Sequence, residues 1–336
     1  MEPLLQVKAL RVYFYTEEGT AKAVDGVDFE IEREQTLAIV GESGCGKSVT
    51  ALSIMGLVRD PPGRVVGGSI LYHRSESILD IVKQNSRGPV MRSIRGNEIA
   101  MIFQEPMTSL NPVYTIGNQI VEAVMLHQKV RPREAKERAV EMLRAVGIST
   151  PERRVNSFPH ELSGGMRQRA MVAMALSCNP SLLIADEPTT ALDVTIQAQV
   201  IELMTSLRAK FHTSLMFITH DLGIVANIAD EVAVMYLGKI VEKGAVRDVL
   251  HGPLHPYTQG LMSSIPSLHD KKGKRLVPIN GIVPSPYNVP AGCAFAARCP
   301  RVMDTCVKIV PELMEMPSGR KVACWLHAGS RMEVRS

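Results

Sequence analysis

The sequence predicts an α/β fold in which a parallel or mixed β-sheet is covered by helices on both faces. Three observations support this prediction. Apolar runs typical of buried strands alternate with helical segments along the first 250 residues. A glycine-rich loop at 41–48 joins one such run to a helix. Another run, at 182–185, ends in two acidic residues, and ligands of α/β folds bind where strands end.

The elements are expected in a regular order. Strands are predicted at 4–12, 24–40, 98–103, 181–185 and 214–219, and a final strand with a turn is predicted at 232–239. Helical periodicity is found at 49–56, 115–147, 162–178 and 194–212. The stretch from Gly67 to Asn97 is polar and irregular, with glycine and proline turns.

The length of the chain and a change in its composition indicate one large domain followed by a smaller one. The chain has 336 residues, more than a typical single domain, and its 45% apolar residues are enough for a full core. Past about residue 252, proline and glycine become frequent and the periodicity weakens. We therefore predict domains at 1–252 and 253–336, with the boundary within 250–265.

Charge and composition restrict the classes of partner that we expect for this protein. The net charge of +4 comes from nearly balanced basic and acidic residues, and aromatic residues make up only 4%, so we expect no nucleic-acid partner. The first eight residues lack the pattern of a signal peptide, and no apolar run is long enough to cross a bilayer. We expect a soluble protein whose membrane role, if it has one, comes through a partner.

The loop Gly41-Glu42-Ser43-Gly44-Cys45-Gly46-Lys47-Ser48 fits the phosphate-binding pattern G-x-x-x-x-G-K-[ST]. Its glycines let backbone N–H groups face a polyphosphate, and the helix that begins near Val49 adds its positive dipole end. Lys47 is expected to reach the β- and γ-phosphates, and Ser48 to ligate Mg²⁺. The alternative is a chance match in a flexible turn, which the strand and helix on either side disfavour.

The run Leu182–Ala185 continues into Asp186 and Glu187. Asp186 is suited to hold Mg²⁺ through water, and Glu187 to polarise the water that attacks the γ-phosphate. The alternative interpretation is a strand that ends in two solvated acids.

A third motif, Leu162-Ser163-Gly164-Gly165-Met166-Arg167-Gln168-Arg169, opens a helix and offers a second anion site at its N-terminus. It resembles the signature sequence of ATP-binding cassette (ABC) ATPases, and the resemblance covers about residues 4–250. The resemblance implies a mixed-sheet core with an antiparallel β subdomain and a helical subdomain. It also implies that two cassettes pair head to tail around ATP. Met166 departs from the family's usual glutamine, and an ordinary Ser-capped helix start is the alternative.

The resemblance implies further nucleotide contacts, in the family's order along the chain. Gln104 resembles the Q-loop glutamine that senses Mg²⁺ and the γ-phosphate, and Ala191-Leu192-Asp193 resembles the D-loop. His220 resembles the switch histidine, whereas Phe14, between Tyr13 and Tyr15, is the predicted adenine-stacking ring.

Three segments resemble the ATPase subunits of dipeptide, oligopeptide and nickel importers: Phe103–Pro112, Ala185–Thr195 and His255–Thr258. The resemblance implies ATP hydrolysis that drives peptide import, with a second cassette (a paralogue), two integral permease subunits and, indirectly, a solute-binding protein. It places the chain peripherally on the cytoplasmic face of the membrane. Met107 and Leu110 suit a surface that receives a coupling helix; packing within the helical subdomain is the alternative.

Other functions stay open at this point. A related importer of nickel or another small solute shares the same motifs. A non-transport ABC ATPase acting on nucleic acid is disfavoured, because this chain holds one cassette and residues 49–161 show no sustained heptads.

Four cysteines, Cys293, Cys299, Cys306 and Cys324, crowd the C-terminal extension. Four thiolates suit either tetrahedral Zn²⁺ or a [4Fe–4S] cluster. The spacing resembles the extension of peptide-importer ATPases, some of which carry an iron–sulfur cluster, so the cluster is favoured over zinc. Free structural thiols are the third possibility. Cys45 and Cys178 are interpreted as non-ligands.

Overall fold

The computed structural model describes residues 2–74, 76–104, 109–190, 192–264 and 278–331. The chain divides into two compact units, and each unit combines segments that are distant in sequence. Unit 1 comprises Met1–Leu4, Ile31–Thr36 and Lys83–Ile218, whereas unit 2 comprises Leu5–Glu30, Leu37–Val82 and Thr219–Ser336. The predicted division into 1–252 and 253–336 therefore stays a proposal.

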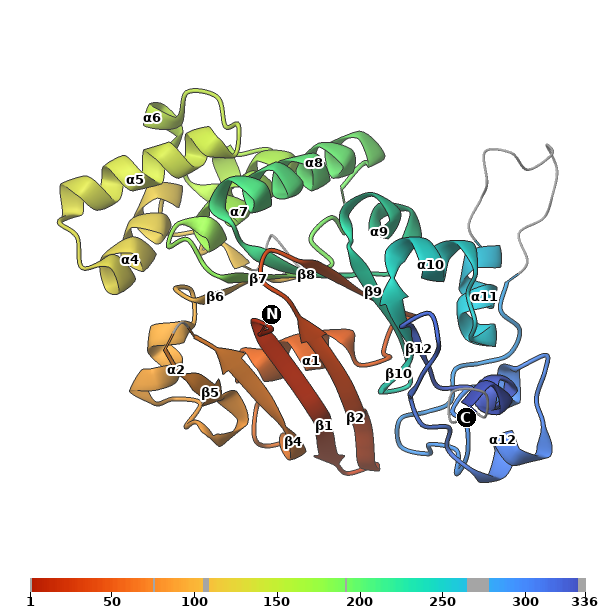
Figure 1. Cartoon of the computed structure of the whole chain (residues 1–336). Helices are drawn as coiled ribbons and strands as arrows, with labels where there is room; N and C mark the ends of the chain where they lie inside the picture. Colours follow the sequence, from red (N-terminus) through yellow and green to blue (C-terminus); the bar gives the residue numbers. More distant parts are fainter. Residues whose placement is uncertain (1, 75, 105–108, 191, 265–277, 332–336) are drawn as a thin grey trace. The chain divides into compact units, whose positions relative to one another are not determined.

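Unit 1 is built on three parallel strands, of which β7 is the middle one (Figure 1). The strands are β6 (Ile99–Ile102), β7 (Leu182–Asp186) and β8 (Ser214–Thr219). Leu183 of β7 lies opposite Ala100 of β6 and Leu215 of β8. Every residue of β7 and β8 is buried, as expected for continuous apolar strands of a parallel sheet. The predictions for these two strands are confirmed.

Helices make up most of the rest of unit 1. They are α2 (Pro89–Ile94), α4 (Ile116–Gln128), α5 (Pro132–Ala145), α6 (Pro151–Arg154), α7 (Gly164–Leu176) and α8 (Val194–Phe211), with the 3-10 helix η2 (Pro159–Glu161). The helical stretch predicted at 115–147 is two helices. Lys129 adopts a left-handed φ of 53°, and Pro132 starts the next helix, so the chain turns between them.

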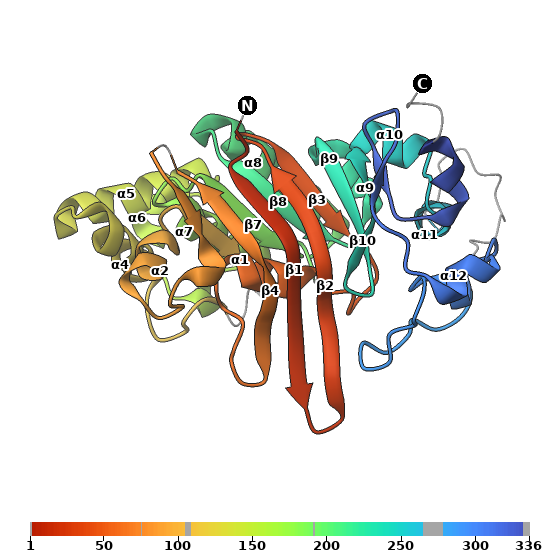
Figure 2. The same cartoon turned by 60° about the horizontal axis from the view of Figure 1, so that its bottom comes forward.

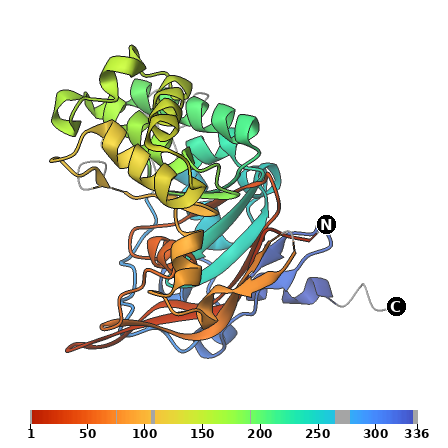
Figure 3. The ribbon, with the colours of Figure 1, turned by 90° about the vertical axis from the view of Figure 1, so that its left-hand side faces the viewer.

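Unit 2 contains a four-stranded sheet in the order β2-β1-β4-β5. Its strands are β1 (Leu5–Thr16), β2 (Gly19–Ile31), β4 (Gly63–His73) and β5 (Ile78–Asp80), followed by the 3-10 helix η1 (Ile81–Lys83). β4 pairs antiparallel with both β1 and β5, which confirms the antiparallel subdomain. Figure 2 shows β1, β2 and β4 as long neighbouring strands, and Figure 3 shows the red pair β1 and β2 from the side.

The other strands of unit 2 follow the order β11-β12-β10-β9-β3. They are β3 (Thr36–Val40), β9 (Glu231–Tyr236), β10 (Lys239–Ala245), β11 (Met314–Glu315) and β12 (Lys321–Val322). β3 pairs parallel with β9, whereas β9–β10, β10–β12 and β12–β11 are antiparallel. Two strands of the C-terminal extension thus continue a sheet that begins beside the glycine loop.

Short helices complete unit 2. They are α1 (Lys47–Ile54), α9 (Leu222–Ile228), α10 (Val246–His251), α11 (Pro256–Ser263) and α12 (Asp304–Lys308), with the 3-10 helices η3 (Ala296–Arg298) and η4 (Trp325–Arg331). In the described part of the chain, no helix combines the length and the apolar character needed to cross a bilayer.

Two sequence predictions were wrong in detail. The strand predicted at 24–40 is two strands separated by a turn at 32–35, where Glu34 has a φ of 59°. The stretch 67–97, predicted as irregular, holds most of β4 together with β5 and α2. By contrast, the last predicted element, a strand with a turn, is confirmed, because β9 joins β10 through a turn at Leu237 and Gly238, which both have positive φ.

Candidate nucleotide site and the cysteine cavity

The phosphate loop, residues 41–48, runs from β3 into α1 within unit 2, as predicted. A Cβ on Gly41 would lie 2.1 Å from the carbonyl oxygen of Met235, and one on Gly46 would lie 2.2 Å from that of Ala23. Both glycines also have positive φ, of 154° and 103°. The backbone of neighbouring segments therefore requires glycine at both positions.

Lys47 is only 5% exposed, and its ammonium lies inside the loop. Nζ donates hydrogen bonds to the carbonyl oxygens of Gly41 at 2.7 Å and Glu42 at 3.1 Å, and lies 3.8 Å from Sγ of Cys45. Ser43 and Gly44 are exposed, whereas Ser48 and Val49 are half-buried in the first turn of α1. That turn contains no acidic side chain, which favours an anion there.

Two other predicted nucleotide contacts lie in unit 2. His220 is exposed and directly follows β8, one residue before Asp221, the cap of α9. Phe14 is half-buried on β1, where it pairs with Gly63, and a Cβ on Gly63 would lie 2.6 Å from its ring. The roles predicted for both residues stay predictions.

The predicted acidic pair ends β7 in unit 1. Asp186 is buried at 4% exposure, and Glu187 is half-buried with a left-handed φ of 45°. Oε2 of Glu187 accepts hydrogen bonds from Thr190 Oγ1 at 3.1 Å and from Gln104 Nε2 at 3.3 Å. The structure thus brings together two predicted residues, Glu187 and Gln104. Strained backbone of this kind is typical of functional positions.

The signature segment, Ser163–Arg169, opens α7 in unit 1. Oγ of Ser163 accepts the N–H of Met166 at 3.3 Å, so Ser163 is the helix cap. Ser163 and Gly164 are exposed, and Gly165 is half-buried. Farther along the helix, fully buried Gln168 donates from Nε2 to the carbonyl oxygen of Pro188, just after the acidic pair. This bond fixes α7 against the end of β7.

The structure describes only some of the residues of the predicted D-loop and Q-loop. Asp193 is exposed and caps α8 by accepting the N–H of Ile196 at 3.0 Å. Ala191 and the stretch 105–108, which includes Met107, lie outside the described residues. Leu110 is only 3% exposed, so this residue packs inside the chain and is not part of an open docking surface.

The four tail cysteines line one small cavity of unit 2, which also includes His255. The backbone N–H of Cys293 donates to the carbonyl oxygen of Cys306 at 2.7 Å, and the N–H of Arg301 donates to Sγ of Cys299 at 3.4 Å. Sequence alone did not show whether these four residues share one location, and the structure places all of them around this cavity.

Metal at this cavity is not confirmed. Among the described residues, no three or more His, Cys, Asp or Glu side chains are grouped so that they could hold a metal ion. Burial, with a smaller contribution from the neighbouring thiols, raises the pKa of Cys293 to about 11. Burial likewise raises the pKa of Cys299 and of Cys324. These thiols therefore stay protonated near neutral pH unless a positive group draws the protons off.

Comparison with known proteins decides the family. Residues 24–190 match the family described as ABC transporter, and residues 241–306 match the oligopeptide/dipeptide transporter C-terminal region. The oligopeptide transport ATP-binding protein AppD of Bacillus subtilis is 54% identical over 327 residues, covering 97% of this chain and 98% of that protein. This chain belongs to the oligopeptide/dipeptide group of ABC transporter ATP-binding proteins. The dipeptide transport protein DppD of the same organism is 49% identical, with coverage of 97% and 95%.

Solved structures confirm the cassette fold of this ABC protein. cbiO1 from Clostridium perfringens, part of the ABC transporter complex cbiONQ, has a TM-score of 0.62 at 25% identity, covering 75% of this chain and 92% of that one. The ATP-binding cassette MJ0796, in a dimeric post-hydrolysis state with ADP and Pi, also has a TM-score of 0.62, at 24% identity and coverage of 72% and 99%. The predicted family and fold class are confirmed.

Sequence reasoning missed three residues that support the cassette's site. Thr190 holds the carboxylate of Glu187, and its position three residues later in the same motif was a usable signal. Tyr257 and Arg298 contact the phosphate loop from the C-terminal extension. Tyr257 belongs to the segment His255–Thr258, which resembles the importer ATPases, so its importance could have been suspected. Nothing in the sequence indicated that Arg298 contacts the loop.

Proposed function

We propose that this chain is the ATP-hydrolysing subunit of an ABC importer of dipeptides or oligopeptides. The observation that carries the proposal is 54% identity with an oligopeptide transport ATP-binding protein along 97% of the chain. The match at 241–306 to the peptide-transporter C-terminal region supports the same cargo class. The phosphate loop supplies the matching chemistry, with a buried lysine and two glycines that no other residue can replace.

We assign the predicted site residues roles in binding ATP and Mg²⁺ or in hydrolysis. Lys47 and the backbone N–H groups of the loop bind the phosphates of the substrate, and Glu187 orients the attacking water. Ser48, Gln104 and Asp186 offer the oxygen ligands that Mg²⁺ prefers. A bound ion would supply positive charge that offsets the negative charge developing on the phosphate oxygens. His220 is assigned to the γ-phosphate by family resemblance.

The proposed assembly contains a second cassette, two permease subunits and, indirectly, a solute-binding protein. The exposed N-terminus of α7, with Ser163 and Gly164, is the surface that we assign to the partner cassette's ATP. This assembly places the chain peripherally on the cytoplasmic face of the membrane.

Reconstitution tests the cargo. The chain is co-expressed with the permeases and second cassette of the proposed assembly, purified, and placed in lipid nanodiscs with the binding protein. We expect ATP turnover to rise when the binding protein carries a dipeptide or oligopeptide. Stimulation by Ni²⁺ alone would assign the related nickel importer, and co-purification with nucleic acid in place of permeases would contradict the proposal.

We also propose that the four tail cysteines hold a [4Fe–4S] cluster. The four thiols line one cavity, and four cysteine thiolates are the ligand set that such a cluster would need. Anaerobic purification should give a brown protein that absorbs at about 400 nm and contains iron and sulfide. Stoichiometric zinc in a colourless protein, or no metal at all, would contradict the cluster. A Cys299→Ser variant should lose the chromophore, whereas a Cys178→Ser variant should keep it.

A further inference from the structure

Glu42, the second residue of the phosphate loop, is held at three points. Its carbonyl oxygen accepts from Nζ of Lys47 at 3.1 Å. Its backbone N–H donates to the hydroxyl oxygen of Tyr257 at 2.9 Å. Its carboxylate forms a two-pronged ion pair with Arg298, at 2.6 Å from Nη1 to Oε2 and 3.0 Å from Nη2 to Oε1. Two of the three points are residues of the C-terminal extension.

Arg298 is placed for this contact. Its side chain is only 4% exposed. Nε donates to the carbonyl oxygen of Asn280 at 3.1 Å, and Nη2 also approaches that of Ile279 at 3.4 Å. The pairing with Glu42 is the main reason why the pKa of Arg298 is raised above its usual value. A planar guanidinium with its donors occupied in this way fixes the direction of the carboxylate that it binds.

Aromatic rings join the two contacts into one support. Tyr236, Tyr257 and Phe295 form a triangle with ring centroids 4.7, 5.3 and 5.4 Å apart. The guanidinium of Arg298 lies 5.8 Å from the ring centroids of both Tyr236 and Phe295. The same apolar cluster includes Val40, the last residue of the strand that leads into the loop. The loop and the extension therefore share one core.

We propose that Arg298 and Tyr257 are positioning residues of the phosphate loop, so that the extension sets how well this chain binds nucleotide. Arg298 neutralises and directs the carboxylate of Glu42, which would otherwise add a free negative charge beside the bound polyphosphate. Tyr257 accepts the N–H of Glu42 and so fixes the start of the loop. The inference rests on the proposed role of residues 41–48 in binding ATP.

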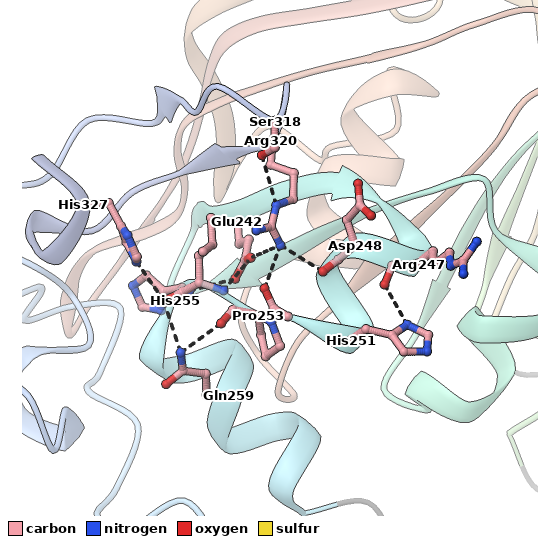
Figure 4. A network of polar contacts seen from close by, with 12 residues as sticks. Glu242, Arg247, Asp248, His251, Pro253, His255, Gln259, Ser318, Arg320 and His327 are labelled. Carbon is pink, nitrogen blue, oxygen red and sulfur yellow. Dashed lines mark hydrogen bonds and ion pairs between the residues drawn. The ribbon is translucent and has the colours of Figure 1, made fainter. Parts of the chain in front are cut away.

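A second contact of the extension provides a matched control (Figure 4). Nη1 of Arg320 donates to the carbonyl oxygens of Gly252 at 2.7 Å and Asp248 at 2.9 Å, and lies 4.0 Å from Oε1 of fully buried Glu242. Arg320 thus ties the extension to β10 and α10, whereas Arg298 ties it to the phosphate loop. Both are arginines of the extension, but only Arg298 contacts the nucleotide loop.

The experiment measures the dissociation constant of a fluorescent ATP analogue with Mg²⁺, and the melting temperature, on the full-length chain. Arg298→Met should weaken binding by about tenfold, because it leaves the carboxylate of Glu42 unpaired beside the negatively charged polyphosphate. Arg320→Met should lower the melting temperature but leave binding within about twofold. Equal affinity in Arg298→Met and the parent, or equal weakening by both variants, would overturn the proposal.

Two further variants separate charge from folding. Adding Glu42→Gln to Arg298→Met removes the unpaired carboxylate, and most of the lost affinity should return; no recovery would exclude the charge argument.

Tyr257→Phe keeps the ring and should weaken binding by about threefold, a smaller loss because the hydrogen bond is uncharged. Tyr257→Phe also covers the case in which Arg298→Met does not fold, and parental affinity in it would contradict the positioning role of Tyr257. Lys47→Ala tests the loop itself: parental affinity there would refute the proposed nucleotide site, whatever the arginine variants show.

Discussion

The phosphate loop and the signature segment both place glycines at the start of a helix, but the chain constrains them very differently. In the phosphate loop, a Cβ on Gly41 would lie 2.1 Å from a backbone oxygen, and Lys47 is buried within the loop. In the signature segment, a Cβ on Gly164 would meet no atom within 4 Å among the described residues. The first site is fixed by its own chain. In the second, a Cβ on Gly165 would lie 3.0 Å from Cγ2 of Ile196, but nothing described in this chain requires glycine at position 164.

This difference has a simple explanation in the proposed dimer. A glycine that no part of its own chain requires is explained if another molecule approaches it, and a partner cassette's nucleotide is such a molecule. Variants in the two segments should therefore fail in different ways. Changes in the phosphate loop should affect the isolated chain, and changes in the signature should affect only the assembled pair.

The largest effect is expected for Gly41→Ala. The added methyl group overlaps the carbonyl oxygen of Met235, so the loop must shift and nucleotide binding should fall by roughly 100-fold or more. Binding of a fluorescent ATP analogue and thermal melting would measure this. Gly44→Ala is the control for folding, because a Cβ there meets no described atom within 4 Å and only its φ of 78° is unfavourable. Equal melting temperatures for both variants and the parent would contradict the comparison.

Next comes Glu187→Gln. The amide can still accept from Thr190 but orients the attacking water poorly, so turnover should fall by about 100-fold or more while ATP affinity stays near that of the parent. Single-turnover hydrolysis by the reconstituted transporter would measure this. Near-normal hydrolysis would exclude Glu187 as the residue that polarises water.

Gly164→Asp sharpens the comparison most directly. An aspartate in the first turn of α7 suits the helix dipole, so the chain should be as stable as the parent or slightly more so, by about 0.5 kcal/mol. The same charge repels a polyphosphate brought by the partner cassette, so turnover of the assembled pair should fall by about tenfold or more. ATP affinity of the isolated chain is the internal control. A lower affinity there would contradict the assignment of the signature segment to the partner cassette's nucleotide.

The smallest effect is expected for Met166→Gln, which restores the family's usual residue. The side chain is half-buried, and its backbone N–H already bonds Ser163. We expect the melting temperature to change little, since stability should shift by no more than about 0.5 kcal/mol, and turnover to rise by at most about threefold. A larger gain would mean that the methionine limits this chain's contact with the partner's nucleotide.

The sequence predicted those parts of the fold in which a local pattern decides the outcome. β7 and β8 are continuous apolar runs, and the glycine loop between a strand and a helix was recognisable from its spacing. The pair Glu42–Arg298 was not predictable, because its members are 256 positions apart and no periodicity links them. β4 was missed because it includes three glycines, which are unfavourable in strands and typical of turns. The break after Gln128 was signalled by Pro132, which starts the next helix.

The pairing of β12 with β10 has a practical consequence for shortened forms of the protein. Lys321 and Val322 of β12 lie opposite Lys243 and Glu242, so the extension covers part of the outer edge of β10. A protein truncated at the composition change near residue 252 would present that edge with unpaired N–H and C=O groups, a template for self-association. The truncated protein should precipitate or form strand-paired oligomers. A loss of activity in the truncated protein would then reflect aggregation as much as the loss of contacts made by the extension.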